Sequence, residues 1–245
     1  VYTMYNTIIN MVNTMIQQVS AGFDFRLGQL YNTEKEVYFR LHHIFEIVYL
    51  VLVFSAMTVV YLVILPFMRL YTAGVSDINY IDSSYPLVFV LVPLLTYGRT
   101  SASNLINYAG HFKETQWRAI AEASINIVVS IIGIYYFGIY GALVGTILAS
   151  LYRTNDMILY VYKYFIKSSP WTTYKRWLSC FVIFGVVVKF INNDPAYCNS
   201  YIHILLYGAL CGVLCVAAYG GVQMIINGEE RRNMIGILKG YLGRG

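Results

Sequence analysis

Long apolar runs separated by short polar connections make up most of the chain. A bilayer core requires about 20 apolar residues of helix to cross it. The runs that predict such helices are residues 2–20, 44–68, 84–107, 117–137, 139–165, 177–191 and 201–226. The sixth run is the shortest and alone falls below the usual length of a span. This pattern predicts an all-α fold, a polytopic membrane helix bundle with about seven transmembrane helices.

The composition agrees with this pattern. Of the 245 residues, 58% are hydrophobic and only 12% are charged, whereas a soluble domain has about 25% charged residues. So few charges cannot cover a globule of this size, which excludes a soluble enzyme, a disordered chain and a disulfide-stapled secreted module. The four cysteines form no CxxC pair, and for Cys211 and Cys215, one turn apart in an apolar run, buried free thiols are the simplest interpretation.

Basic residues gather in every second connection between the predicted helices, and the intervening connections are poor in them. They are Arg26, Lys35, Arg40, Lys113, Lys163, Lys167, Lys175, Arg176, Arg231, Arg232, Lys239 and Arg244. Under the positive-inside rule these connections are cytoplasmic, so the C-terminus is expected in the cytoplasm. Omitting the sixth helix would place the basic tail outside, which favours keeping it. The net charge of +5 therefore indicates membrane orientation, and no nucleic-acid partner is expected.

Polar side chains form stripes at helical spacing on several of the predicted spans. They are Asn6, Asn10, Asn13 and Gln17 on the first, Arg99, Asn104 and Asn107 on the third, and Glu122 and Asn126 on the fourth. Two interpretations compete. Amides and hydroxyls often hydrogen-bond between spans and only hold helices together. Because the stripes recur on several helices, we favour a shared hydrophilic substrate cavity lined by these residues.

Two charged residues within the predicted spans sharpen this hypothesis. Arg99 and Glu122 lie on helices joined by a short connection, so they are expected to come close enough to pair. Arg118, one turn before Glu122, competes for the same carboxylate. A structural ion pair is one interpretation, and recognition of an anionic substrate group by Arg99 is the other. Glu46 is expected at the membrane interface, and Asp156 is expected to pair with Arg153.

Small residues recur every four positions on the fifth predicted helix, at Gly141, Gly145 and Ala149, which predicts close helix packing. Gly138 is expected to form a tight turn before them. The sequence has no nucleophile–base arrangement, no HExxH, no metal-ligand cluster and no phosphate-binding loop. Neither an enzyme, a metal site nor a cofactor is predicted.

Several segments resemble the polysaccharide (O-antigen type) flippases of the multidrug/oligosaccharidyl-lipid/polysaccharide exporter superfamily. The similar segments are NLINYAGHFKET at 104–115, EASIN at 122–126, YFGIYGALVGT at 136–146, PFMRLYTAG at 66–74 and YTMYNTI at 2–8. The resemblance implies a two-lobed transporter that works by alternating access. Residues 1–165 would be the core of its C-terminal lobe, five helices without the first of that lobe. Residues 166–245 would add two transmembrane helices and a basic cytoplasmic tail.

The same resemblance implies a function in the bacterial inner membrane. Such a protein moves an undecaprenyl-pyrophosphate-linked oligosaccharide across the membrane for the synthesis of surface polysaccharide, including lipopolysaccharide. Arg99 would then be the candidate for receiving the pyrophosphate. Expected partners are this lipid-linked oligosaccharide, membrane lipids, the missing N-terminal lobe of the same chain, and polysaccharide polymerase and glycosyltransferases.

Two alternatives remain open at this point. The first is a cation-coupled multidrug exporter of the same superfamily, in which Glu122 would be the essential buried acid. The second is a membrane-embedded polysaccharide polymerase or glycosyltransferase. That class needs catalytic carboxylates or arginines on large external loops, and the predicted external connections are short.

Overall fold

The computed structural model describes residues 1–75, 80–191, 194, 196 and 198–242, with side chains described as far as residue 236. Within these residues every regular element is a helix, so the predicted all-α fold is confirmed. The elements are α1 (Tyr2–Thr33), α2 (Lys35–Tyr71), α3 (Tyr85–Gly98), α4 (Thr100–Tyr108), α5 (Phe112–Phe137), α6 (Ile139–Val161), the π-helical η1 (Tyr162–Ile166), α7 (Trp171–Phe190), α8 (Tyr201–Ile226) and α9 (Gly228–Leu242).

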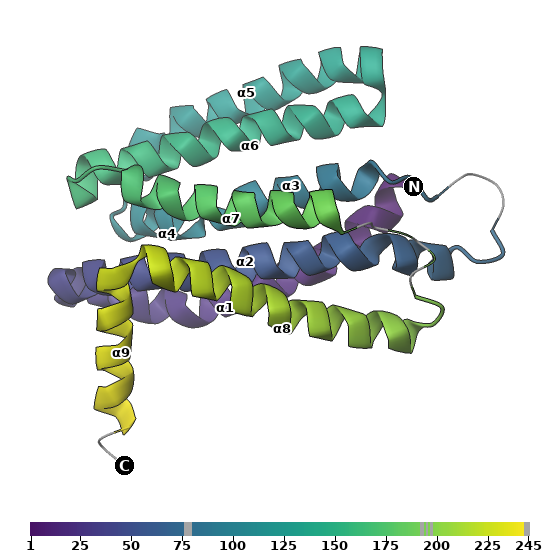
Figure 1. Ribbon diagram of the computed structural model, residues 1–245. Coiled ribbons are helices and arrows are strands. Elements are labelled where there is room, and N and C mark those ends of the chain that lie inside the picture. Colours follow the sequence, from purple (N-terminus) through teal and green to yellow (C-terminus); the bar gives the residue numbers. More distant parts are fainter. Residues whose placement is uncertain (76–79, 192–193, 195, 197, 243–245) are drawn as a thin grey trace.

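The long helices run side by side, and only α9 lies crosswise to them (Figure 1). The central helix is α2, which packs against α1, α3, α7 and α8. The helices α5 and α6 form a hairpin that contacts the rest of the bundle mainly through α3. At one end of the bundle α1 meets α2, α4 meets α5, η1 leads to α7, and α8 meets α9 (Figure 1). We call this end the basic end, because several basic residues lie at or near these junctions, namely Lys35, Lys113, Lys163, Lys167, Lys175, Arg231 and Arg232.

Three helices in the described part of the chain are long and apolar enough to cross a membrane, namely α2, α5 and α8. Most of the apolar stretch of α2 is buried inside the bundle. By contrast, none of the corresponding stretch of α5 is buried, and Ile127, Ile131 and Tyr135 on it are more than half exposed. An exposed apolar surface of this kind is typical of a face that contacts lipid or another protein. The chain is therefore compatible with a membrane protein.

Aromatic side chains fill the space between α2 and the last helices. The ring of Phe54 on α2 makes edge contacts with Trp177 and Phe181 of α7, at centroid distances of 5.9 and 5.1 Å. It also lies 5.9 Å from the ring of Tyr219 on α8, whose hydroxyl is 2.8 Å from that of Thr58. The hydroxyls are thus satisfied inside an otherwise apolar core.

The α5–α6 hairpin depends on small residues, as the sequence predicted. Gly138 joins the helices with φ of 57°, a conformation that side chains disfavour. Above the turn the two backbones touch, because a Cβ added to Gly141 would lie 2.0 Å from the carbonyl of Gly133. One turn later, a Cβ added to Gly145 would lie 2.3 Å from the Ser130 hydroxyl. The glycines therefore determine the separation of α5 and α6.

Polar contacts tie this hairpin to the start of α3, opposite the basic end. The hydroxyl of Tyr140 donates a 2.6 Å hydrogen bond to Asp82, and the backbone N–H of Ser84 donates a second one of 2.8 Å. The bond from Tyr140 lowers the pKa of the Asp82 carboxyl. The rings of Tyr85 and Tyr140 stack beside it, with centroids 4.7 Å apart.

A buried ion cluster attaches α7, α8 and α9 to α2. Arg176 of α7 is fully buried and forms ion pairs with Glu46 of α2 and Glu230 of α9. Its Nε donates a 2.7 Å hydrogen bond to Asn227, between α8 and α9. The other carboxylate oxygen of Glu46 accepts a 2.5 Å hydrogen bond from Thr173. We expected Arg176 in a connecting loop, which is wrong because it lies on α7 and is buried against Glu46. The position of Glu46 at the membrane interface stays a prediction.

We predict that Gly141→Ala lowers the stability of the purified protein by about 1–3 kcal/mol, the usual cost of overpacking. The added methyl group would meet backbone, which cannot rotate away. Gly185→Ala on α7 is the matched control, because an added Cβ there meets nothing within 4 Å. Thermal unfolding in detergent measures both variants. Equal melting temperatures for the two would contradict the close contact of α5 and α6.

We also predict that Arg176→Gln destabilises the protein by about 3–5 kcal/mol, because it leaves the buried carboxylate of Glu46 without its partner. Glu46→Gln combined with Arg176→Gln should restore part of this loss. The control is Lys175→Gln, which removes the same charge from an exposed neighbour and should have little effect. Chemical unfolding in detergent gives the comparison, and a double variant no better than Arg176→Gln would refute the pairing.

Candidate functional site

The third predicted span is interrupted where Arg99 stands. We expected one continuous helix over residues 84–107, but α3 ends at Gly98 and α4 begins at Thr100. The hydroxyl of Thr154 on α6 donates a 3.1 Å hydrogen bond to the carbonyl of Leu95 in the last turn of α3. A carbonyl near a helix end is thus satisfied by a neighbouring helix. The indole of Trp177 packs so closely on Gly98 that an added Cβ there would lie 2.5 Å away.

Arg99 belongs to an ion network that joins this break to the α5–α6 hairpin. Its Nη2 lies 2.9 Å from Oε1 of Glu122 on α5, so the expected proximity of these two residues is confirmed. The other oxygen of Glu122 lies 3.6 Å from Nε of Arg153 on α6. Arg153 also pairs with Asp156 at 3.1 Å, as expected. Arg118 pairs with Asp156 and not with Glu122, because Asp156 faces it from the adjacent helix.

This network contains three guanidinium groups and two carboxylates, so it carries one excess positive charge if all five groups are ionised. The side chain of Arg99 is only 13% exposed. Its Nη1 is buried and finds no hydrogen-bond partner within the part of the chain that the structure describes. A buried donor without an acceptor is costly. Arg99 therefore has both the charge and a free donor to bind an anionic group.

A cavity of about 390 Å³ adjoins Arg99 between α1, α2, α3, α4 and α6. We call it the arginine cavity. Its polar lining comprises Gln17, Ser20, Asp24, Tyr49, Thr96, Tyr97, Arg99, Thr100, Ser103 and Asn104. The amide nitrogen of Asn104 is a second buried donor with no partner among the described residues. The cavity thus combines a cationic group with donors that lack acceptors, which suits a ligand rich in phosphate or hydroxyl oxygens.

A second cavity of about 180 Å³ continues along α1, α3 and α6, and we call it the amide cavity. Three amides of the predicted stripe, Asn6, Asn10 and Asn13, line it together with Thr146. Thr96 and Tyr97 line both cavities. The side-chain nitrogen of Gln17 donates a 2.5 Å hydrogen bond to the Tyr97 hydroxyl at this boundary. The stripe on α1 therefore follows two adjoining cavities.

Three of the predicted cavity residues, Glu122, Asn107 and Asn126, line neither of these two cavities. Asn107 is exposed. Asn126 accepts hydrogen bonds from Ser130 at 2.9 Å and from Thr146 at 3.4 Å. Through Thr146 it adjoins the amide cavity, and through Ser130 it helps to hold the α5–α6 hairpin together.

Sequence reasoning missed several residues of this site. The sequence predicts Arg153 only as a partner of Asp156, and the structure adds its contact with Glu122. Tyr97 and Asp24 line the arginine cavity, and Tyr108 donates a hydrogen bond to Asp24. For Arg153 the signal was available, since a second arginine within an apolar helix requires a partner. The positions of Tyr97 and Asp24 depend on how α1 packs against α3 and α4, which no local spacing encodes.

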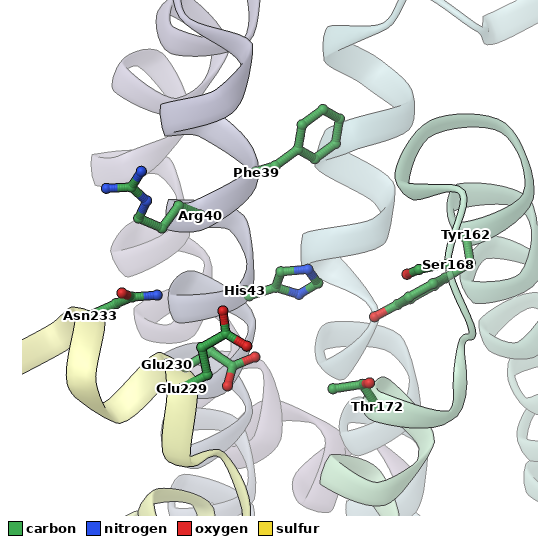
Figure 2. Close-up of a pocket in the computed structure, with 9 residues that line it drawn as sticks. All are labelled: Phe39, Arg40, His43, Tyr162, Ser168, Thr172, Glu229, Glu230 and Asn233. Atoms are coloured by element: carbon green, nitrogen blue, oxygen red, sulfur yellow. The ribbon is translucent and has the colours of Figure 1, made fainter.

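A larger pocket of about 740 Å³ lies at the basic end, between α2, η1, α7 and α9. Figure 2 shows His43 of α2 directed toward Tyr162, with Glu229 and Glu230 of α9 beside it. Arg40, Ser168, Thr172 and Asn233 complete the polar lining. Glu230 is already paired with Arg176, and Nδ1 of His43 lies 3.3 Å from Nη1 of Arg176. None of the buried, partnerless donors of the described residues lines this pocket, so the arginine cavity is the better candidate site.

In the described residues, no group of three or more His, Cys, Asp or Glu side chains is arranged to hold a metal ion. Comparison of the chain with family models, with curated proteins and with solved structures gives no match.

Proposed function

We propose that this chain is the C-terminal part of a membrane transporter that moves a lipid-linked oligosaccharide across the cytoplasmic membrane of a bacterium. The substrate would be of the undecaprenyl-pyrophosphate type and would serve the synthesis of surface polysaccharide. The single observation that carries this proposal is Arg99, a guanidinium with a buried partnerless donor, which stands at a helix break and lines a polar cavity. Interrupted spans commonly form the substrate sites of transporters.

The arginine cavity suits the pyrophosphate in hydrogen bonding, and Arg99 supplies a positive charge on a lining that also holds Asp24. An arriving phosphate oxygen would bind Nη1 of Arg99 and the amide of Asn104, both of which lack acceptors in the described chain. Glu122 would keep its contact with Arg153 when the phosphate attracts Arg99 away from it. The excess positive charge of the network would then be neutralised by the substrate.

The amide cavity suits the sugar. Asn6, Asn10 and Asn13 line it with both donors and acceptors, and the buried carbonyl oxygen of Asn13 has no partner among the described residues. Aromatic rings of Tyr2 and Phe89 lie on the same lining. Amides beside aromatic rings suit the alternating hydroxyls and apolar faces of a sugar ring.

The topology we propose has seven spans, α1, α2, α3 with α4, α5, α6, α7 and α8, with the basic end in the cytoplasm. Supporting this, these helices lie side by side (Figure 1), and most Lys and Arg residues lie near the basic end. The N-terminal lobe of the same protein would face the two cavities and complete the pathway. The further partners would be membrane lipids and the enzymes that make and polymerise the oligosaccharide.

The multidrug exporter remains the second candidate, but the surroundings of Glu122 favour the flippase. A coupling acid must be able to bind a proton during transport. Both carboxylate oxygens of Glu122 instead lie within 3.6 Å of guanidinium groups, one on Arg99 and one on Arg153. This arrangement suits a counter-ion of Arg99 better than a proton carrier.

We predict that Arg99→Ala, made in the intact protein, lowers surface polysaccharide at least tenfold while the amount of protein in the membrane is unchanged. One strong charge-assisted contact is worth about 1.5–3 kcal/mol, which corresponds to a factor of ten or more. Lys189→Ala is the control, since Lys189 lies on α7 at the opposite end. Normal polysaccharide in the Arg99→Ala cells would remove Arg99 from the mechanism. Lost drug resistance in Glu122→Gln cells, with normal polysaccharide, would favour the exporter.

A second prediction tests whether the substrate binds in the arginine cavity, by comparing a residue that lines the cavity with one on the same helix that does not. Asn104→Leu should reduce transport severalfold, because it replaces a free donor in the cavity by an apolar group. Asn107→Leu, three residues later on the same helix, should have little effect because Asn107 is exposed and lines neither cavity. Surface polysaccharide, normalised to the membrane level of each variant, measures the difference. Equal effects of the two substitutions would argue against a substrate site in this cavity.

A further inference from the structure

The last helix leaves the bundle in a different direction from all the others. In Figure 1, α9 runs crosswise to the long helices at the basic end and projects beyond α1 and α8. If the long helices cross the membrane, α9 lies along its surface. Asn227 alone separates α9 from α8, so the change of direction takes place within a single residue.

Contacts of Glu230 and Asn227 with the buried Arg176 fix this direction. Glu230 in the first turn of α9 pairs with the buried Arg176, and the side chain of Asn227 accepts a hydrogen bond from the same guanidinium. The amide of Asn227 also donates to the carbonyl and to the side-chain oxygen of Gln223 on α8, at 2.8 and 2.9 Å. A loosely attached tail would not bury these groups, so α9 is a fixed part of the bundle.

The side of α9 that points away from these contacts is both basic and apolar. Arg231 and Arg232 are exposed, and Ile235, which follows them by four and three residues, is 45% exposed. Such residues share one face of a helix. The sequence repeats this pattern, with Leu238, Lys239 and Leu242 at the next helical intervals. An apolar centre flanked by basic side chains is typical of helices that lie in the membrane interface.

We infer that α9 is an in-plane helix that rests on anionic phospholipid headgroups. Charge complementarity supports this partner, because Lys163, Lys167 and Lys175 are also exposed at the basic end. Ile235 enters the boundary between headgroups and acyl chains, while Arg231 and Arg232 contact the phosphates beside it. Each basic side chain near an anionic surface contributes about 1 kcal/mol. The binding surface is separate from the arginine cavity and does not depend on the proposed transport function.

Trypsin tests this inference on the full chain in lipid nanodiscs. One preparation contains phosphatidylcholine alone and the other contains equal parts of phosphatidylglycerol. Cleavage after Arg231 and Arg232 requires α9 to detach and open. Two basic contacts at about 1 kcal/mol each predict roughly tenfold or greater slowing in the anionic nanodiscs. Cleavage after Lys189, exposed near the opposite end of the bundle, is the internal control and should be much less affected.

Two variants separate lipid binding from attachment to the protein itself. Ile235→Asp puts a negative charge on the proposed lipid-contacting face and should abolish the slowing. Asn233→Asp adds the same charge on the opposite side of the helix, where Asn233 lines the pocket at the basic end, and should keep most of the slowing. Equal cleavage in the two lipids, or equal loss of protection in both variants, would overturn the inference.

Discussion

Guanidinium groups held between apolar helices must keep carboxylates within reach, and this requirement determines how most elements of the structure meet. Each buried arginine has acidic partners on other helices. Arg176 pairs with Glu46 of α2 and Glu230 of α9, and Arg99 pairs with Glu122 of α5. An unpaired charge in such surroundings costs several kcal/mol. The helices therefore cannot slide or rotate past one another without losing these pairs.

The two charged regions are built differently, and the difference suggests different roles. Around Arg176, described side chains occupy every nitrogen of the guanidinium, so this region holds α2, α7 and α9 together. Around Arg99, one nitrogen has no partner in the described chain and the adjoining space is open. A fully satisfied network makes a rigid support, and a partly satisfied one suits a binding site. Both belong to one bundle, in which the support does not have to change when a ligand binds.

Much of this arrangement could be predicted from local patterns. Helical spacing indicated the amide stripe, small residues indicated the α5–α6 contact, and the short connection before α5 indicated that Arg99 and Glu122 are close. Other features depend on contacts between distant parts of the chain. Arg176 is buried against Glu46, 130 positions earlier, and the Leu95 carbonyl beside the break in the third span accepts a hydrogen bond from Thr154, 59 positions later. No spacing within one helix contains that information.

The same separation along the chain has a consequence for biogenesis. Glu46 is synthesised long before Arg176, so the first helices must leave the ribosome with an acid whose partner does not yet exist. During this interval water, lipid headgroups or the insertion machinery have to accommodate the carboxylate. The pair can form only once α7 has been synthesised, although α2 can already pack against α1 and α3. A nascent chain stalled before α7 would therefore keep this carboxylate without its arginine.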